Sequence, residues 1–222
     1  MINILGNVYA IHEDWCFDAF RPYIRSTDRV ALVLLAYRED RLPDAAAWDA
    51  LYGAPKGIYY QGITESFAAY GIPPEQMTSI NFFADTPETA REKIESADIL
   101  YFPGGLPDKM MERIEQMRLA ETLCRHEGVV IGYSAGAMVQ LDEYHITPDK
   151  DYPEYVYGKG LGFLSGFDVE VHYEATPQQE AAIRRYLSER SKPVYAMGNA
   201  GALIVENGRI TPVGDVTLFM AE

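Results

Sequence analysis

The stretch Val129-Val130-Ile131-Gly132-Tyr133-Ser134-Ala135-Gly136-Ala137-Met138 decides the fold of this chain. An apolar run of β-forming residues ends abruptly at a serine flanked by two glycines, and small residues follow. This order is typical of a strand that turns sharply into a helix and presents a nucleophile on the turn. Gly132 and Gly136 lack the Cβ atoms that would collide in so sharp a turn. Because a serine hydroxyl is a weak nucleophile that needs a positioned base, we expect Ser134 to be the catalytic residue of a hydrolase site.

The same turn predicts an oxyanion site. A helix that starts after Ser134 directs its first free N–H groups back toward the serine, so the N–H of Ala135 is one candidate donor. The glycine pair Gly104-Gly105 follows another apolar segment, and Gly105 is the preferred second donor with Gly104 beside it. A turn from strand to helix also favours glycine for structural reasons, so the pair alone identifies no oxyanion site.

Segments with the pattern of strands alternate with segments with the pattern of helices through the first two thirds of the chain. Nearly unbroken apolar runs, such as 30–36, are typical of strands buried on both faces of a parallel sheet. The pattern predicts an α/β fold in three layers, with a mainly parallel sheet, helices on both faces, a small antiparallel C-terminal extension and a single domain over residues 1–222. We expect strands at 1–8, 29–37, 77–84, 98–103 and 129–133, and helices at 13–24, 58–70, 86–97, from Met110 to about His126 and at 176–191.

The remaining segments are less regular. Residues 38–56 are expected to form a loop or short helix, and residues 142–163 are rich in Asp, Tyr, Pro and Gly and predict irregular structure. Further strands are expected at 167–173 and 193–197, and the glycines of 198–201 predict a turn. The last segments (202–205, 209–213 and 216–220) predict a small hairpin or meander around Glu206-Asn207-Gly208.

A serine nucleophile needs a base, and the chain has four histidines. Reactive groups of parallel α/β sheets gather beyond the carboxyl ends of the strands. His172 stands at the end of an expected strand and is the preferred base. His145, in the irregular segment, is the weaker alternative, while His12 and His126 lie elsewhere.

Composition excludes several classes of partner. With 19 basic and 33 acidic residues, the formal net charge is −14, which argues against nucleic acid or anionic lipid. We expect a cytoplasmic location, because no run reaches the ~20 apolar residues of a membrane span and the N-terminus lacks signal-peptide character. No cysteine or histidine spacing predicts a metal or cofactor site. The oligomeric state is left open between monomer and homodimer.

With these residues in place, the chain resembles the family of peptidase E (α-aspartyl dipeptidase) and cyanophycinase, whose fold is similar to the class I glutamine amidotransferase domain. The resemblance rests on the glycine pair, on the G-x-S-A-G-A turn and on a histidine that ends a D-V-x-V-H segment some forty positions later. It implies a serine peptidase for small peptides, with Ser134 as nucleophile, His172 as base, and Gly105 and Ala135 as oxyanion donors.

The chain also departs from the family pattern. Family members often continue the glycine pair as G-G-N-T, where this chain has Leu106-Pro107. The acidic third member of the family's triad would map onto Asn199, whose amide oxygen can accept from the histidine but carries no full charge. A carboxylate could come instead from four acids, and the sequence does not decide among them: Asp142, Glu143, Asp149 and Glu174.

The basic residues of segment 142–163 are Lys150, Lys159 and His145, so no arginine is available there to receive an aspartate side chain. Two hypotheses stand beside the serine peptidase. A serine esterase of the α/β-hydrolase type shares G-x-S-x-G, although about fifty residues follow His172 here. A non-catalytic ligand-binding domain of the same fold is favoured by Asn199 and by the missing Asn-Thr pair.

Overall fold

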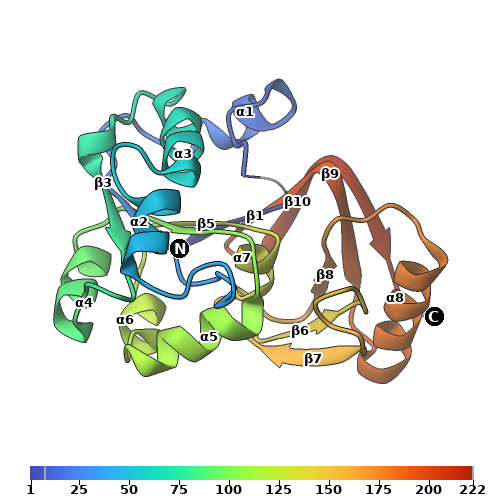
Figure 1. Ribbon diagram of the computed structural model, residues 1–222. Coiled ribbons are helices and arrows are strands. Elements are labelled where there is room, and N and C mark those ends of the chain that lie inside the picture. Colours follow the sequence, from blue (N-terminus) through green and yellow to red (C-terminus); the bar gives the residue numbers. More distant parts are fainter. Residues whose placement is uncertain (8, 222) are drawn as a thin grey trace.

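An eight-stranded sheet covered by helices on both faces organises the chain (Figure 1). The computed structural model describes residues 1–7 and 9–221, so Val8, which the sequence assigns to the first strand, lies outside the described residues. The strand order is β10-β9-β1-β5-β4-β2-β3, with β8 paired to β9. The expected mainly parallel α/β fold is confirmed. The sheet strands are β1 (Ile2–Gly6), β2 (Val30–Val33), β3 (Met77–Ile80), β4 (Ile99–Phe102), β5 (Val129–Tyr133), β8 (Asp168–Glu170), β9 (Val194–Glu206) and β10 (Arg209–Phe219).

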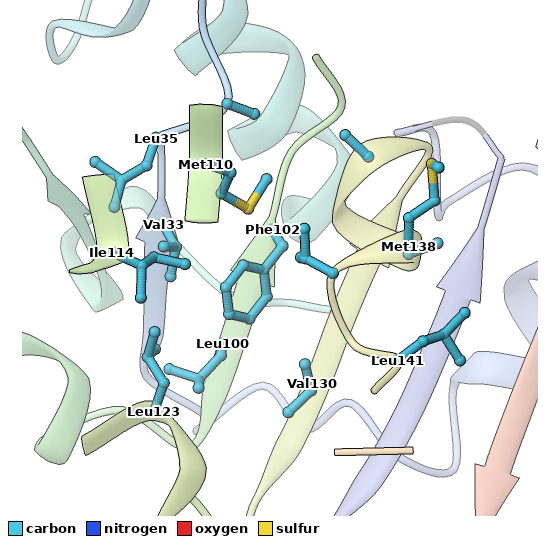
Figure 2. Packing of buried hydrophobic residues seen from close by; sticks show 14 of the residues in the cluster. Val33, Leu35, Leu100, Phe102, Met110, Ile114, Leu123, Val130, Met138 and Leu141 are labelled. Atoms are coloured by element: carbon cyan, nitrogen blue, oxygen red, sulfur yellow. The ribbon is translucent and has the colours of Figure 1, made fainter. Parts of the chain in front are cut away.

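Successive side chains on the central strands point to opposite faces of the sheet and pack into two separate hydrophobic cores. Even-numbered Ile4 and Leu32 face α1 (Asp14–Phe20), α2 (Ala45–Tyr52) and α3 (Ile58–Ala68). Their neighbours Leu5 and Val33 face the opposite helices, α4 (Pro87–Glu95), α5 (Pro107–Gln116), α6 (Ala120–Cys124) and α7 (Ala135–Met138). Figure 2 shows Phe102 in this second core, among side chains of α5, α7 and the neighbouring strands. Burial on both faces explains why these strands are apolar without interruption.

The expected helix up to about His126 is two helices. Arg118 has a φ of 54°, a left-handed conformation that no α-helix can contain, and it separates α5 from α6. Other helices begin where their caps predict. Thr86 caps α4 with Pro87 at its first position, and Thr176 caps α8 (Pro177–Arg190) through a capping box with Gln179.

Two further expectations are wrong. Residues 198–201 form no turn, because β9 runs through them as one strand of 13 residues, although its pairing with β10 is irregular between Met197 and Gly201. The stretch 142–163 is not wholly irregular, since β6 (Glu143–Ile146) and β7 (Val156–Lys159) form an antiparallel hairpin in it. The hairpin turn around Asn207–Gly208 is confirmed. Within the described residues, no helix has the length and apolar character needed to cross a membrane.

The pairing of β9 determines where the predicted site residues come together. On the edge of β9 opposite β10, β8 pairs with residues 194–196 and β1 pairs with residues 202–206. Since β1 runs antiparallel and β8 parallel to β9, both strands end toward the unpaired gap between them. The side chains that follow β1 and β8 therefore converge near the middle of β9.

Candidate active site

Ser134 occupies a strained turn between β5 and α7. Its φ of 52° and ψ of −118° are unusual for a residue with a Cβ, and such strain persists only where the surroundings hold it. The Ser134 N–H donates to the carbonyl of Gly6 at 3.0 Å, which fixes the turn against β1. A Cβ added at Gly136 would overlap the Phe102 carbonyl oxygen, so only glycine permits this approach of α7 to β4.

His172 lies within hydrogen-bond distance of the serine. Its Nε2 is 2.9 Å from Ser134 Oγ. The histidine follows β8 with a φ of 52°, and two side chains hold its backbone. Its N–H donates to Asn7 Oδ1 at 2.7 Å, and its carbonyl accepts from Gln179 Nε2 at 2.8 Å. The structure thus brings together the two residues that the sequence predicts as nucleophile and base.

Asn199 lies in the gap on β9 where β1 and β8 end. Asn7 Nδ2 donates to Asn199 Oδ1 at 3.2 Å, so Asn7 links the amide to the backbone of His172. The pKa of His172 is lowered chiefly by burial, and a side-chain hydrogen bond with Asn199 opposes this by raising it. The charges of Glu170 and Glu174 also raise the pKa of His172. An imidazole with a lowered pKa is neutral near pH 7 and can accept a proton.

The four alternative acids lie in other surroundings. Glu143 pairs with Arg190, and Asp142 lies 3.7 Å from Lys192 Nζ. Asp149 accepts the backbone N–H groups of residues 151 and 152 within its own loop. Glu174 acts on His172 only through its charge, as far as the described residues show. Of the five candidates, Asn199 is therefore the one whose hydrogen bonding raises the pKa of His172.

The glycine pair adjoins the serine, and its two members differ. Gly105 has a φ of 138°, and a Cβ there would overlap the Ala36 carbonyl oxygen, so the position requires glycine. Burial raises the pKa of Tyr133 to about 12, although the Gly104 backbone lowers it by hydrogen bonding to the Tyr133 hydroxyl. Gly104 also lies against the Tyr133 ring, since a Cβ at this position would come within 2.7 Å of Tyr133 Cε2. The amides of Gly105 and Ala135 have no acceptor among residues 1–7 and 9–221, and both residues line the pocket beside Ser134.

His145, the weaker candidate base, is directed elsewhere. Its Nδ1 lies 2.7 Å from Asp168 Oδ2 and its Nε2 lies 2.7 Å from Glu170 Oε2, so both ring nitrogens are engaged by carboxylates. The two acids belong to β8 and His145 to β6. Burial lowers the pKa of His145, but its hydrogen bonds to the two acids outweigh this and raise the pKa to about 9.

A pocket of about 320 Å³ opens between these groups. Ser134, His172, Gly105 and Ala135 lie in its wall, together with residues of the β6–β7 hairpin and of the turn before α8. In Figure 1 this hairpin, β8 and α8 gather at one end of the sheet, beyond α7. The volume is in the range of small-molecule binding sites.

Several residues of the site were not predicted from the sequence. Asn7 and Gln179 hold His172 through its backbone, and no motif indicates such a role. The acids of β8 could have been predicted from the sequence, because residues 168, 170 and 172 are spaced two apart and so lie on the same face of a strand. Their partner His145 lies more than twenty positions earlier, which a local pattern cannot reveal.

Comparison with known proteins gives a family. The sequence profile of peptidase family S51 matches residues 45–213, most of the chain and all of the predicted site residues. The chain belongs to peptidase family S51. This membership supports a peptidase, a hydrolase of peptide bonds. No curated protein matches the sequence.

Solved structures share the fold of this S51 member. One is a candidate peptidase E protein from Listeria monocytogenes EGD-e, with a TM-score of 0.68 and 14% identity over 95% of this chain and 96% of that one. Another is a peptidase from an acI-B1 Actinobacterium, with a TM-score of 0.65 and 16% identity over 100% of this chain and 90% of that one. At such identities the likeness establishes the fold alone.

Proposed function

We propose that this S51 family member is a serine peptidase that hydrolyses small peptides through an acyl-enzyme on Ser134. The observation that carries the proposal is the 2.9 Å distance between His172 Nε2 and Ser134 Oγ at the strained turn after β5. In the first step, Nε2 takes the hydroxyl proton while Oγ attacks the peptide carbonyl carbon. The N–H groups of Ala135 and Gly105 stabilise the oxyanion that forms.

Collapse of this intermediate breaks the C–N bond. The His172 imidazolium gives its proton to the departing amine, and His172 then activates a water that hydrolyses the ester on Ser134. Asn199 Oδ1 accepts from the other ring nitrogen and holds the tautomer that leaves Nε2 free to accept. A neutral amide orients the ring without supplying the charge that a carboxylate would add.

The proposal is tested by intact-mass analysis after incubation with a fluorophosphonate probe. The wild type is expected to gain one adduct, and Ser134→Ala and His172→Ala are expected to gain none while remaining folded by circular dichroism. Ser66→Ala is a matched control, because Ser66 Oγ also lies near a histidine, 3.1 Å from His12 Nδ1, but within α3 and without backbone strain. This variant should label like the wild type.

The outcomes separate the hypotheses. An adduct that persists in Ser134→Ala would contradict the assignment of the nucleophile. A folded wild type that gains no adduct and cleaves no peptide in a dipeptide library would favour the non-catalytic ligand-binding domain. Turnover of short acyl esters without any turnover of peptides would favour the esterase.

A further inference from the structure

A buried charged cluster of three residues, Asp168, His145 and Glu170, adjoins the pocket beside Ser134, and His145 and Glu170 line that pocket. The side chains of His145 and Asp168 are 0% exposed, and that of Glu170 is 5% exposed. Buried charges are costly unless hydrogen bonds compensate them. The mechanism proposed above uses none of the three, so their retention beside the site needs a reason.

The hydrogen bonds of the cluster are unevenly distributed. Asp168 Oδ2 accepts from the N–H of His145 and lies 2.7 Å from its Nδ1, while Oδ1 accepts from the N–H of Val169 at 2.7 Å. Glu170 Oε2 lies 2.7 Å from His145 Nε2 and accepts from Thr147 Oγ1 at 2.7 Å. Glu170 Oε1, by contrast, accepts no hydrogen bond from residues 1–7 and 9–221. Glu170 lines the pocket, so this vacant oxygen is available to a ligand there.

The charge of the pocket points to the kind of ligand. The His145 imidazolium, held by hydrogen bonds to both acids, and the two carboxylates together carry a net charge of −1. Asp149 and Glu174 add two further carboxylates to the pocket wall, and no lysine or arginine of the described residues lines it. A substrate carboxylate would meet repulsion in this pocket, whereas a cationic nitrogen would gain a charge-assisted hydrogen bond to a largely desolvated acid.

We propose that Glu170 Oε1 receives a cationic nitrogen of the peptide substrate, an ammonium or guanidinium group, and that the pocket selects peptides by this positive charge. The inference rests on the proposed function for the nature of the ligand. His145 holds Glu170 in place from behind, and Asp168 holds His145. The cation has two possible sources, the α-ammonium group of the peptide or a basic side chain, and both present the same chemistry to Glu170.

The test measures binding to Ser134→Ala, which cannot form the acyl-enzyme. Isothermal titration calorimetry is run with Lys-Ala, N-acetyl-Lys-Ala, norleucyl-Ala and Glu-Ala. Removing the cation that contacts Glu170 is expected to weaken binding about 10- to 150-fold, which corresponds to a hydrogen bond to a charged group. A loss on acetylation identifies the α-ammonium group as the source, and a loss on replacing lysine by norleucine identifies the side chain.

The second part of the experiment changes the protein. The variant Ser134→Ala/Glu170→Gln keeps the shape of the residue-170 side chain and removes its charge. This variant should bind Lys-Ala, N-acetyl-Lys-Ala and norleucyl-Ala within about threefold of one another. Ser134→Ala/Glu174→Gln is the matched control, because Glu174 is an exposed carboxylate of the same pocket, and it should keep the preference for the cation. If Glu170→Gln does not fold, the comparison of the four peptides on Ser134→Ala still tests whether the pocket selects cationic peptides, and Ser134→Ala/Glu174→Gln tests whether Glu174 is responsible.

Equal binding of all four peptides, or preferred binding of Glu-Ala, would overturn the inference. An equal loss for every peptide in the Glu170→Gln variant would also overturn it, because Glu170 would then only support the pocket wall. These outcomes are independent of the fluorophosphonate result. A labelled wild type with no charge preference refutes the cation site alone, whereas a cation preference without labelling refutes the serine mechanism alone.

Discussion

Replacing Asn199 by aspartate should shift the acid limb of the pH–activity profile to higher pH. His172 must be neutral to act as base, so kcat/KM falls as pH drops through the pKa of His172 in the free enzyme. In the wild type this pKa is lowered, chiefly by burial, and the limb should lie below the ordinary histidine pKa of about 6.5. A carboxylate at position 199 favours the imidazolium and raises the pKa.

The size of the shift follows from the environment. A carboxylate within hydrogen-bond distance of an ionisable group changes its pKa by about 1 to 3 units. His172 is solvent-exposed on one side, which screens the charge, so we expect about one unit. The plateau of kcat/KM should rise about fivefold, because a charge-assisted hydrogen bond is roughly twice as strong as a neutral one and adds about 1 kcal/mol. Asp also keeps the oxygen that accepts from Asn7.

Asn199→Ala should act in the opposite direction. It removes the acceptor that raises the pKa of His172, so the acid limb should move further down. The plateau should fall about 10- to 150-fold, because the imidazolium loses a hydrogen bond worth about 1.5–3 kcal/mol. The two variants therefore separate the charge at position 199 from its hydrogen bond.

The assay is kcat/KM against pH between 4.5 and 9 with one fluorogenic dipeptide, together with NMR titration of the His172 ring, assigned by its loss in His172→Gln. Asn207→Asp is the matched control, because it adds the same charge in the β9–β10 turn, away from the site. Its acid limb should coincide with that of the wild type. Coincident limbs for Asn199→Asp and Asn207→Asp would refute the contact between Asn199 and His172.

Three further predictions concern the frame of the site. Gly105→Ala should lower kcat about 10²- to 10³-fold in steady-state assays, because a Cβ at this positive φ overlaps the Ala36 carbonyl oxygen and displaces an oxyanion donor; unchanged kcat would exclude that role. Gln179→Ala should reduce the free energy of unfolding by about 1 kcal/mol in urea titrations and lower kcat, since it frees the His172 carbonyl and opens the α8 capping box; a loss of stability with full activity would show that the cap alone matters. Ile114→Ala, in the core between α5 and the sheet, should cost about 2–5 kcal/mol of stability by urea titration and leave the pH profile unchanged; a shifted profile would indicate coupling between core and site.

The sequence was sufficient to predict the parallel core of the sheet and to place Ser134 and His172 at the ends of strands. Uninterrupted apolar runs and sharp strand ends are local signals, and they carry most of the information about a parallel sheet. Local signals could not predict that β9 continues as one strand from Val194 to Glu206. Residues 198–201 have the composition of a turn, but β9 continues through them, because β10 pairs with β9 on both sides of an irregularity between Gly214 and Val216. That pairing is a long-range property of the folded chain.

The position of Asn199 illustrates the same limit. The family pattern places it in the turn that follows a strand, whereas the structure places it within β9, at the gap between the ends of β1 and β8. Asn7 follows β1 and contacts both Asn199 and the His172 backbone, so it depends on three segments that are distant in sequence. No pattern within one segment could predict that contact.

The neutral amide at position 199 and the acidic pocket can be understood together. The negative charge that a triad acid would supply is absent from position 199, but Glu170 and Glu174 raise the pKa of His172 from a greater distance. Charges at a distance stabilise an imidazolium less than a contacting carboxylate does. A cation bound at Glu170 would cancel part of that stabilisation and lower the pKa of His172 in the complex. His172 would then be neutral, and able to accept the serine proton, most fully when a cationic peptide fills the pocket. An aspartate at position 199 would oppose this coupling, because it would hold the imidazolium whether or not the peptide carried a positive charge.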